Sequence, residues 1–143
     1  MKLEELHEQW NEDSEISLNL SREAIQIPKL HGRYFKILSS ERLRLKKLES
    51  ELKELKLDKT EFYTLGPTQE QHNKGWKLPA CGKILKAEVN QYLESDRELI
   101  EQSLKIAYQQ EKVEFLMSII SSLNNRGYLL RTILDYEKFK HGN

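Results

Sequence analysis

Apolar residues recur at helical spacing through the second quarter of the chain. The seam follows the three-four alternation of a heptad repeat through residues 28–64: Tyr34, Leu38, Leu45, Leu48, Leu52, Leu55 and Phe62. Glu41 and Lys59 occupy two further slots of the same seam. A heptad seam is typical of coiled-coil-like packing. The pattern therefore predicts one long helix, with Pro28 in its first turn, where a missing N–H is tolerated.

A second heptad pattern lies in the C-terminal half. Between residues 113 and 123 apolar side chains fall on nearly every face, and a helix that is apolar all round is buried on all sides. We expect neighbouring subunits to supply part of that burial. The residues predicted to form the oligomer interface are those of the repeat: Leu99, Ile106, Val113, Leu116, Ile120 and Leu123.

Shorter elements are predicted around these two helices. Leu3, Leu6 and Trp10 have helical spacing, and Ser95 with Glu98 forms a capping-box pattern that predicts the start of the C-terminal helix. Trp76 and Leu78 are expected to hold a Gly- and Pro-rich loop against the body. Residues 124–127 predict a break or weak point.

The fold class predicted is all-α, with extended helices in coiled-coil-like packing. A single helical domain over residues 1–143 is expected, in four parts: acidic short helices over 1–27, a basic long helix over 28–64, a loop over 65–82 and a C-terminal oligomerisation region over 83–142.

Composition favours a soluble, cytoplasmic protein. Apolar residues make up 38% of the chain and charged residues 32%, a lean core that suits helices completed by partner chains. The sequence shows neither a signal peptide nor an apolar run long enough to cross a bilayer. The single cysteine, Cys81, excludes an intrachain disulfide and a cysteine-rich zinc site.

The net charge of zero conceals a segregation of charge. Residues 1–28 carry −5, and residues 29–59 carry +5. Cations beside the seam of one helix could bind the phosphates of single-stranded nucleic acid, with aromatic rings as stacking platforms. The candidate nucleic-acid-binding residues are these: Arg42, Arg44, Lys46, Lys47, Lys53, Lys56, Lys59 and Tyr63. Phe62 is expected in the core, and an ordinary solvated helix face remains the alternative for the cations.

No catalytic constellation stands out, so we expect a non-enzymatic protein without cofactor or metal. The four histidines are scattered, and the sequence contains no phosphate-binding loop, nucleophile elbow or dinucleotide fingerprint. Gln102 and Gln109 allow two interpretations: polar residues that set the register of an oligomer seam, or surface residues.

Several strings along nearly the whole chain resemble the UvsY family of recombination mediators from T-even-like phages, most of all its branch from phages of marine cyanobacteria. The most distinctive is residues 122–128 (SLNNRGY), and the others are residues 75–79, 84–86, 103–106, 109–112 and 137–139.

The resemblance implies a homo-oligomeric ring, typically a heptamer, that binds single-stranded DNA. It implies that the protein acts in the infected host cell and helps a RecA-like phage recombinase to replace the phage single-strand-binding protein. The family motif Lys-x-Arg-x-Asp-Tyr-Tyr corresponds to residues 57–63, where Lys59 takes the place of the arginine and Leu57 that of the lysine. The alternatives are a coiled-coil scaffold that does not bind nucleic acid, and a small nucleic-acid-modifying enzyme, against which the missing phosphate loop argues.

Overall fold

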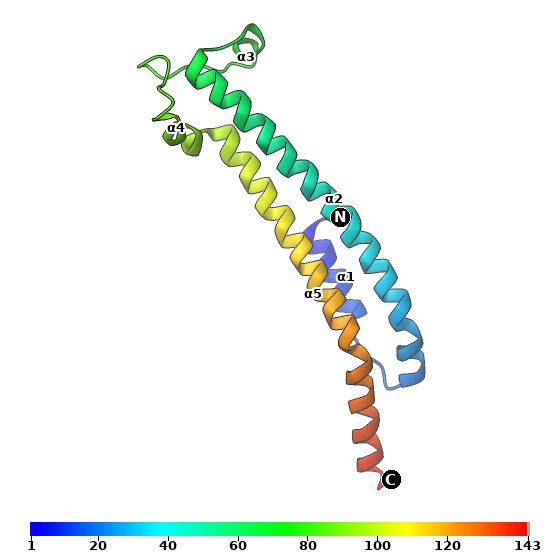
Figure 1. Cartoon of the computed structure of the whole chain (residues 1–143). Coiled ribbons are helices and arrows are strands. Elements are labelled where there is room, and N and C mark those ends of the chain that lie inside the picture. The colour runs from blue at the N-terminus through cyan, green and yellow to red at the C-terminus, as the bar shows by residue number, and fades with distance from the viewer. Residues whose placement is uncertain (143) are drawn as a thin grey trace. The chain divides into compact units, whose positions relative to one another are not determined.

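A computed structural model describes residues 1–142, and within them every regular element is a helix. The order is α1 (Leu3–Asp13), α2 (Leu20–Leu65), α3 (Gln69–Asn73), α4 (Val89–Ser95) and α5 (Arg97–Lys140), shown in Figure 1. The predicted all-α class is confirmed. None of these helices combines the length and apolar character that crossing a membrane requires.

The contacts divide the chain into two compact units. The first unit contains Met1–Leu43 and Gln109–Asn143, and the second contains Arg44–Tyr108. Helix α2 has 46 residues and α5 has 44, so both long helices contribute to both units. Within each unit the segments of α2 and α5 run antiparallel, as Figure 1 shows.

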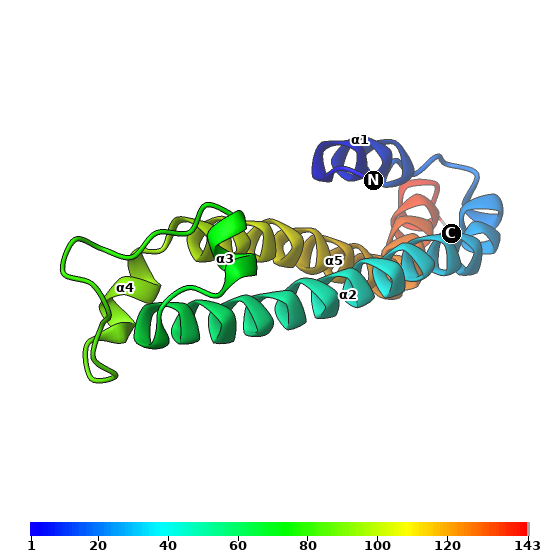
Figure 2. The ribbon, with the colours of Figure 1, turned by 90° about the horizontal axis from the view of Figure 1, so that it is seen from above.

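The first unit has its core where α1, the start of α2 and the second half of α5 meet. Buried side chains come from all three: Leu6, Leu30, Tyr34, Leu38, Leu116, Ile119 and Leu123. The ring of Trp10 meets that of Tyr34 edge-on, with centroids 5.5 Å apart, and the Tyr34 hydroxyl donates to Asp13 at 2.7 Å. Figure 2 shows α1 on one side of the two longer segments.

A buried polar pair joins the two long helices in the first unit. Lys112 Nζ lies 3.1 Å from a carboxylate oxygen of Glu41, and the amide of Gln109 donates to the Glu41 backbone carbonyl at 2.9 Å. In the second unit Gln102 donates to the carbonyl of Leu48 at 3.0 Å. Both glutamines thus donate a hydrogen bond to α2 of their own chain. This role is neither of the two interpretations offered by the sequence, an oligomer seam or a free surface.

The core of the second unit lies where α4 and the start of α5 pack against the end of α2. Its buried cluster consists of Ile84, Val89, Leu93 and Leu99, with Leu52, Leu55, Tyr63 and Tyr92 packed against it. Figures 1 and 2 show α3 and α4 at the end of α2, where the chain returns to begin α5. Trp76 is buried and Leu78 half-buried, so the loop is held as expected.

The structure differs from the prediction at two places: the helix start expected at Pro28 and the break expected over residues 124–127. Pro28 does not begin the long helix, because α2 starts at Leu20 and continues through the proline. Asn19 provides the start signal, since its side chain accepts from the Arg22 N–H at 3.3 Å. The break expected over residues 124–127 is also absent from α5, which stays helical because Leu123 and Leu130 are buried on either side.

The segment between the long helices also differs in detail. Residues 66–82 contain α3, which Thr68 and Gln71 begin with a reciprocal capping box that was not predicted. The C-terminal region expected from residue 83 begins its first helix, α4, only at Val89. Asp96 rather than Ser95 caps α5, because its carboxylate accepts from the Leu99 N–H at 3.1 Å.

Candidate nucleic-acid interface

A row of lysines lies on the exposed face of α2 in the second unit. Lys46 and Lys53 are seven residues apart and Lys56 follows three residues later, so the three side chains share one face of the helix. All three are exposed. We call Lys46, Lys53 and Lys56 the lysine row. Arg44 and Lys47, also exposed, lie on other sides of α2 by the same spacing, and exposed Arg42 belongs to the first unit.

A row of acidic side chains runs beside the lysine row. Its members are spaced by three or four residues and are all exposed: Glu51, Glu54, Asp58 and Glu61. At about 100° per residue, the centres of the two rows are roughly a third of a turn apart. By the same spacing, half-buried Glu49 falls within the lysine row and Lys47 within the acidic row, so the two rows differ in the sign of their excess charge. A polyanion would be attracted to the first and repelled from the second.

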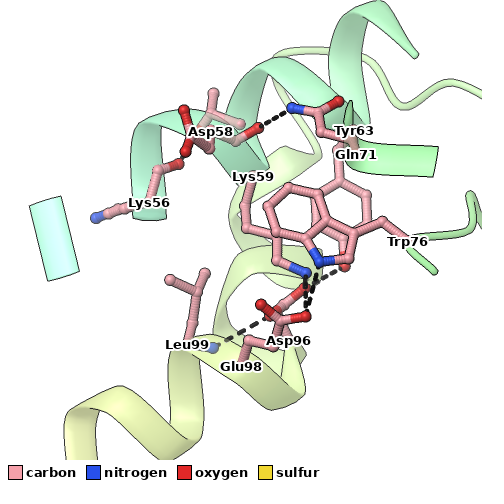
Figure 3. Close-up of polar contacts among 10 residues, drawn as sticks. Lys56, Asp58, Lys59, Tyr63, Gln71, Trp76, Asp96, Glu98 and Leu99 are labelled. Atoms are coloured by element: carbon pink, nitrogen blue, oxygen red, sulfur yellow. Dashed lines mark hydrogen bonds and ion pairs between the residues drawn. The ribbon is translucent and has the colours of Figure 1, made fainter. Parts of the chain in front are cut away.

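Lys59 corrects the expectation that all the cations face outward. Its side chain is 5% exposed and its Nζ lies 3.1 Å from Asp96 and 3.6 Å from Glu98. In Figure 3 Lys59 points into this cluster, whereas Lys56 points away from it. The reason is its slot in the heptad seam, which α2 turns toward α5. Lys59 is therefore inaccessible to a phosphate in this conformation.

Asp96 is the centre of the buried cluster. Its carboxylate accepts from the Tyr63 hydroxyl at 2.7 Å and from the Leu99 N–H, and it pairs with Lys59. Burial alone would raise the pKa of this carboxyl, but the hydrogen bonds from Tyr63, Leu99 and Lys59 outweigh burial and hold the pKa below its ordinary value. Asp96 is therefore a structural anion that joins α2 to the start of α5.

Trp76 closes the cluster from the loop side. The Lys59 ammonium lies 3.8 Å from the centre of the indole ring, within the range of a cation–π contact. The indole N–H donates to Glu98 at 2.7 Å, as Figure 3 shows. The loop is thus fixed to both long helices through one lysine and one carboxylate.

The two aromatic residues beside Lys59 are also turned inward. Phe62 is buried, as expected of a core residue. Tyr63 is half-buried against the core cluster, and both its burial and its hydrogen bond to Asp96 raise the pKa of its hydroxyl. With its hydroxyl bound to Asp96 and its ring packed, Tyr63 is not presented as an open stacking platform.

The residues predicted for the oligomer interface lie mostly inside the chain. Five of the six are buried within the single chain: Leu99, Ile106, Val113, Leu116 and Leu123. Ile120 is half-buried. The expectation that neighbouring subunits supply part of this burial is not met for these five side chains, which the chain buries by itself.

Apolar side chains are exposed instead at the C-terminal end of α5. The group consists of Tyr128, Leu129, Leu134, Tyr136 and Phe139, of which Phe139 is 81% exposed. We call these residues the terminal apolar group. Among residues 1–142 no three histidine, cysteine or acidic side chains gather as a metal site would require.

Comparisons with known proteins agree with this fold. Crystal structures of the bacteriophage T4 recombination mediator protein UvsY are similar to the chain over its whole length. One lattice form gives a TM-score of 0.80 at 22% identity and covers 99% of both chains. Another gives 0.80 at 18% identity, covering 95% of this chain and 98% of the other.

Sequence comparison adds the family. No curated protein sequence matches the chain. The family described as recombination, repair and ssDNA binding protein UvsY matches residues 9–143. The chain therefore belongs to the UvsY family of recombination, repair and single-stranded-DNA-binding proteins.

Proposed function

We propose that the protein is a recombination mediator that holds single-stranded DNA on the lysine row of α2. In this role it helps a RecA-like phage recombinase to take the place of the phage single-strand-binding protein, in the cytoplasm of the infected host. Membership of the UvsY family supports the role. The observation that carries the proposed site is the alignment of Lys46, Lys53 and Lys56 on one exposed face.

The chemistry of the row suits binding without sequence preference. Lysine ammonium groups attract phosphates as point charges and do not read base edges. The acidic row beside them limits the strand to one side of the helix, which favours a defined path over general adhesion. Lys59 takes a supporting role, since its ion pair with Asp96 fixes the part of α2 that carries Lys53 and Lys56.

We further propose a homo-oligomer, a heptameric ring as the family resemblance implies, built through the terminal apolar group. Exposed apolar side chains that share a face favour association. Tyr128, Tyr136 and Phe139 share one face of α5 by their spacing and are 76%, 63% and 81% exposed. A ring would repeat the lysine row in every subunit. Repetition raises the effective concentration of the next row once one row has bound the strand.

The test is a DNA titration with a matched pair of double variants. Lys53→Ala with Lys56→Ala removes two cations of the row, and alanine preserves the helix. Fluorescence anisotropy with a labelled oligonucleotide should show weaker binding. The plot of log affinity against log salt should become shallower by about 0.7 for each phosphate that the variant no longer neutralises.

The control removes the same charge elsewhere. Lys77→Ala with Lys86→Ala deletes two exposed lysines from the segment between α3 and α4. Its affinity and salt slope should stay close to those of the wild type. Equal losses in both double variants would show that only net charge matters, and no loss in either would refute the site.

A further inference from the structure

Arg126 belongs to the most distinctive string of the family resemblance, and the DNA site does not use it. The residue lies within α5 in the first unit, and its side chain is 4% exposed. One guanidinium nitrogen, Nη2, donates to the backbone carbonyl of Asp13 at 2.8 Å. The other terminal nitrogen, Nη1, is buried and has no hydrogen-bond partner among the residues that the structure describes.

The charge of Arg126 also lacks a contacting carboxylate within residues 1–142. Asp13 offers the guanidinium only its backbone oxygen, since its carboxylate accepts from Tyr34 at 2.7 Å and pairs with Arg33 at 3.1 Å. The indole ring of Trp10 lies 6.0 Å away, at the outer limit of a cation–π contact. A buried guanidinium with an unpartnered N–H and no anion lowers the stability of the folded state, unless a bound group accepts the hydrogen bond and neutralises the charge.

Arg126 lines a cavity of about 220 Å³ that has the chemistry to admit such a group. Three polar side chains share the wall: Ser14, Ser122 and Asn125. Trp10 and Leu129 give it an apolar side. The Ser14 hydroxyl already donates to the Asn11 carbonyl at 3.0 Å. The Ser122 hydroxyl and the Asn125 amide are further hydrogen-bond donors, so an oxyanion in the cavity would meet these donors together with one positive charge.

We propose that this cavity is a receptor for one carboxylate group, presented by the side chain or C-terminus of a protein. A carboxylate carries the single charge that matches one arginine and can accept from the unpartnered Nη1. A nucleic-acid strand fits less well, because exposed Glu12 and Glu15, on either side of Ser14 in the sequence, repel its repeated charges more than a single carboxylate. Water would satisfy Nη1 but would not neutralise the guanidinium.

The first test uses acetate as the probe carboxylate. Melting temperatures are measured in sodium acetate and in sodium chloride at equal ionic strength. The wild type should gain several degrees more from acetate than Arg126→Met does, because a ligand stabilises the state that binds it. Arg131→Met is the matched control, since Arg131 is exposed on the same helix and should leave the acetate response unchanged.

The second test applies if a carboxylate of another copy of the chain already occupies the cavity, so that acetate cannot enter. In that case Arg126→Met should lower the mass measured by light scattering, while Arg131→Met should not. Asn125→Leu keeps Arg126 and its bond to Asp13, so it provides the comparison if Arg126→Met fails to fold. Asn125→Leu should show the same reduced acetate response as Arg126→Met or, if a second copy fills the cavity, the same reduced mass by light scattering.

Two outcomes would overturn the proposal. One is an unchanged acetate response together with an unchanged mass in both cavity variants, which would leave the cavity to water. The other is a loss of oligonucleotide affinity in Arg126→Met without any effect of acetate or on mass, which would assign the cavity to phosphate.

Discussion

Lys59 stands at the place of the arginine in the family's basic motif, yet its ammonium lies inside the protein. It is sandwiched between the indole ring of Trp76 and the carboxylate of Asp96. A positive charge in this position stabilises the packing of α2 against α5 rather than a bound strand. The lysines therefore have two different roles. Lys53 and Lys56 face solvent, and Lys59, through its ion pair with Asp96, stabilises the helix that carries them.

The first prediction separates these two roles. Lys59→Met keeps the length of the side chain but leaves Asp96 buried without its cation, which should cost about 3–5 kcal/mol of unfolding free energy. Urea unfolding at one protein concentration measures the cost, and anisotropy measures DNA affinity under conditions where the variant is folded. Affinity should stay near that of the wild type.

The matched substitution is Lys53→Met on the exposed face. Here stability should change by no more than about 0.5 kcal/mol, because an exposed lysine without a buried partner contributes little, while DNA affinity should fall. The opposite pattern, with Lys59→Met stable but poor in DNA binding, would return Lys59 to the interface.

A second prediction concerns pH. The carboxyl pKa of Asp96 is lowered in the folded protein, so its contribution to stability is present above the ordinary value of 3.8 and is lost as pH falls through the lowered folded-state value. Asp96→Asn removes this titration while asparagine can still cap α5. The wild type should be the more stable at pH 7, and the difference in unfolding free energy should shrink as the pH falls below 3.8 and through the lowered folded-state pKa. A difference independent of pH would show that the carboxylate charge is not what stabilises the cluster.

The heptad repeat predicted the seam slots of Glu41 and Lys59 correctly. The partners of these residues could not be predicted, because Lys112 and Asp96 lie far along the chain and pair only once α2 and α5 are aligned. The burial of Lys59 followed from its seam slot, but its place in the motif suggested an outward orientation. Position in the repeat was the better guide.

At the scale of elements, local signals predicted the helices better than their ends. The capping box of Thr68 and Gln71 was present in the sequence, and α3 was missed because glycines and prolines surround it. Residue types predict a helix start at Pro28 and a break at residues 124–127. Both lie inside helices of more than 40 residues, whose tertiary packing outweighs one missing hydrogen bond or one weak helix former.

A third prediction belongs to the end of α5. Phe139→Asp places a charge in the terminal apolar group and should convert the assembly into smaller species by light scattering, ideally toward the 17.0 kDa of one chain. Helicity should be unchanged, because Phe139 is not part of the buried core of its chain. Leu104→Asp, an exposed site earlier in α5, is the control and should keep the native mass. A native mass for Phe139→Asp would move the interface elsewhere.

At the scale of the whole molecule, the sequence predicted an all-helical protein with a long basic helix, and the structure confirms both the class and the helix. It did not reveal the division into two compact units, since heptad spacing continues across residues 43 and 44 without a change. It also overestimated how much of α5 needs partner subunits. The contact of α1 with α5, made by the rings of His7 and Phe115, depends on the turn between α1 and α2, which spacing alone cannot orient.

Separate surfaces of the molecule therefore serve the separate tasks that we propose for it. The lysine row holds the strand, the cluster around Asp96 keeps α2 in place, and the terminal apolar group joins subunits. Removing the lysine row should leave the terminal apolar group intact and the reverse, because the two sets share no partner residue.

The most direct measurement of the central claim is recombinase loading on a strand already coated by the single-strand-binding protein. The rate of coat displacement is followed by fluorescence with the wild type, with Lys53→Ala/Lys56→Ala and with Lys77→Ala/Lys86→Ala. We predict that loading falls in the first variant in parallel with its loss of DNA affinity, while helicity and mass stay native, and that the second variant loads as the wild type does. Wild-type loading by the lysine-row variant, despite its weaker DNA binding, would contradict the claim that this row holds the strand for the recombinase.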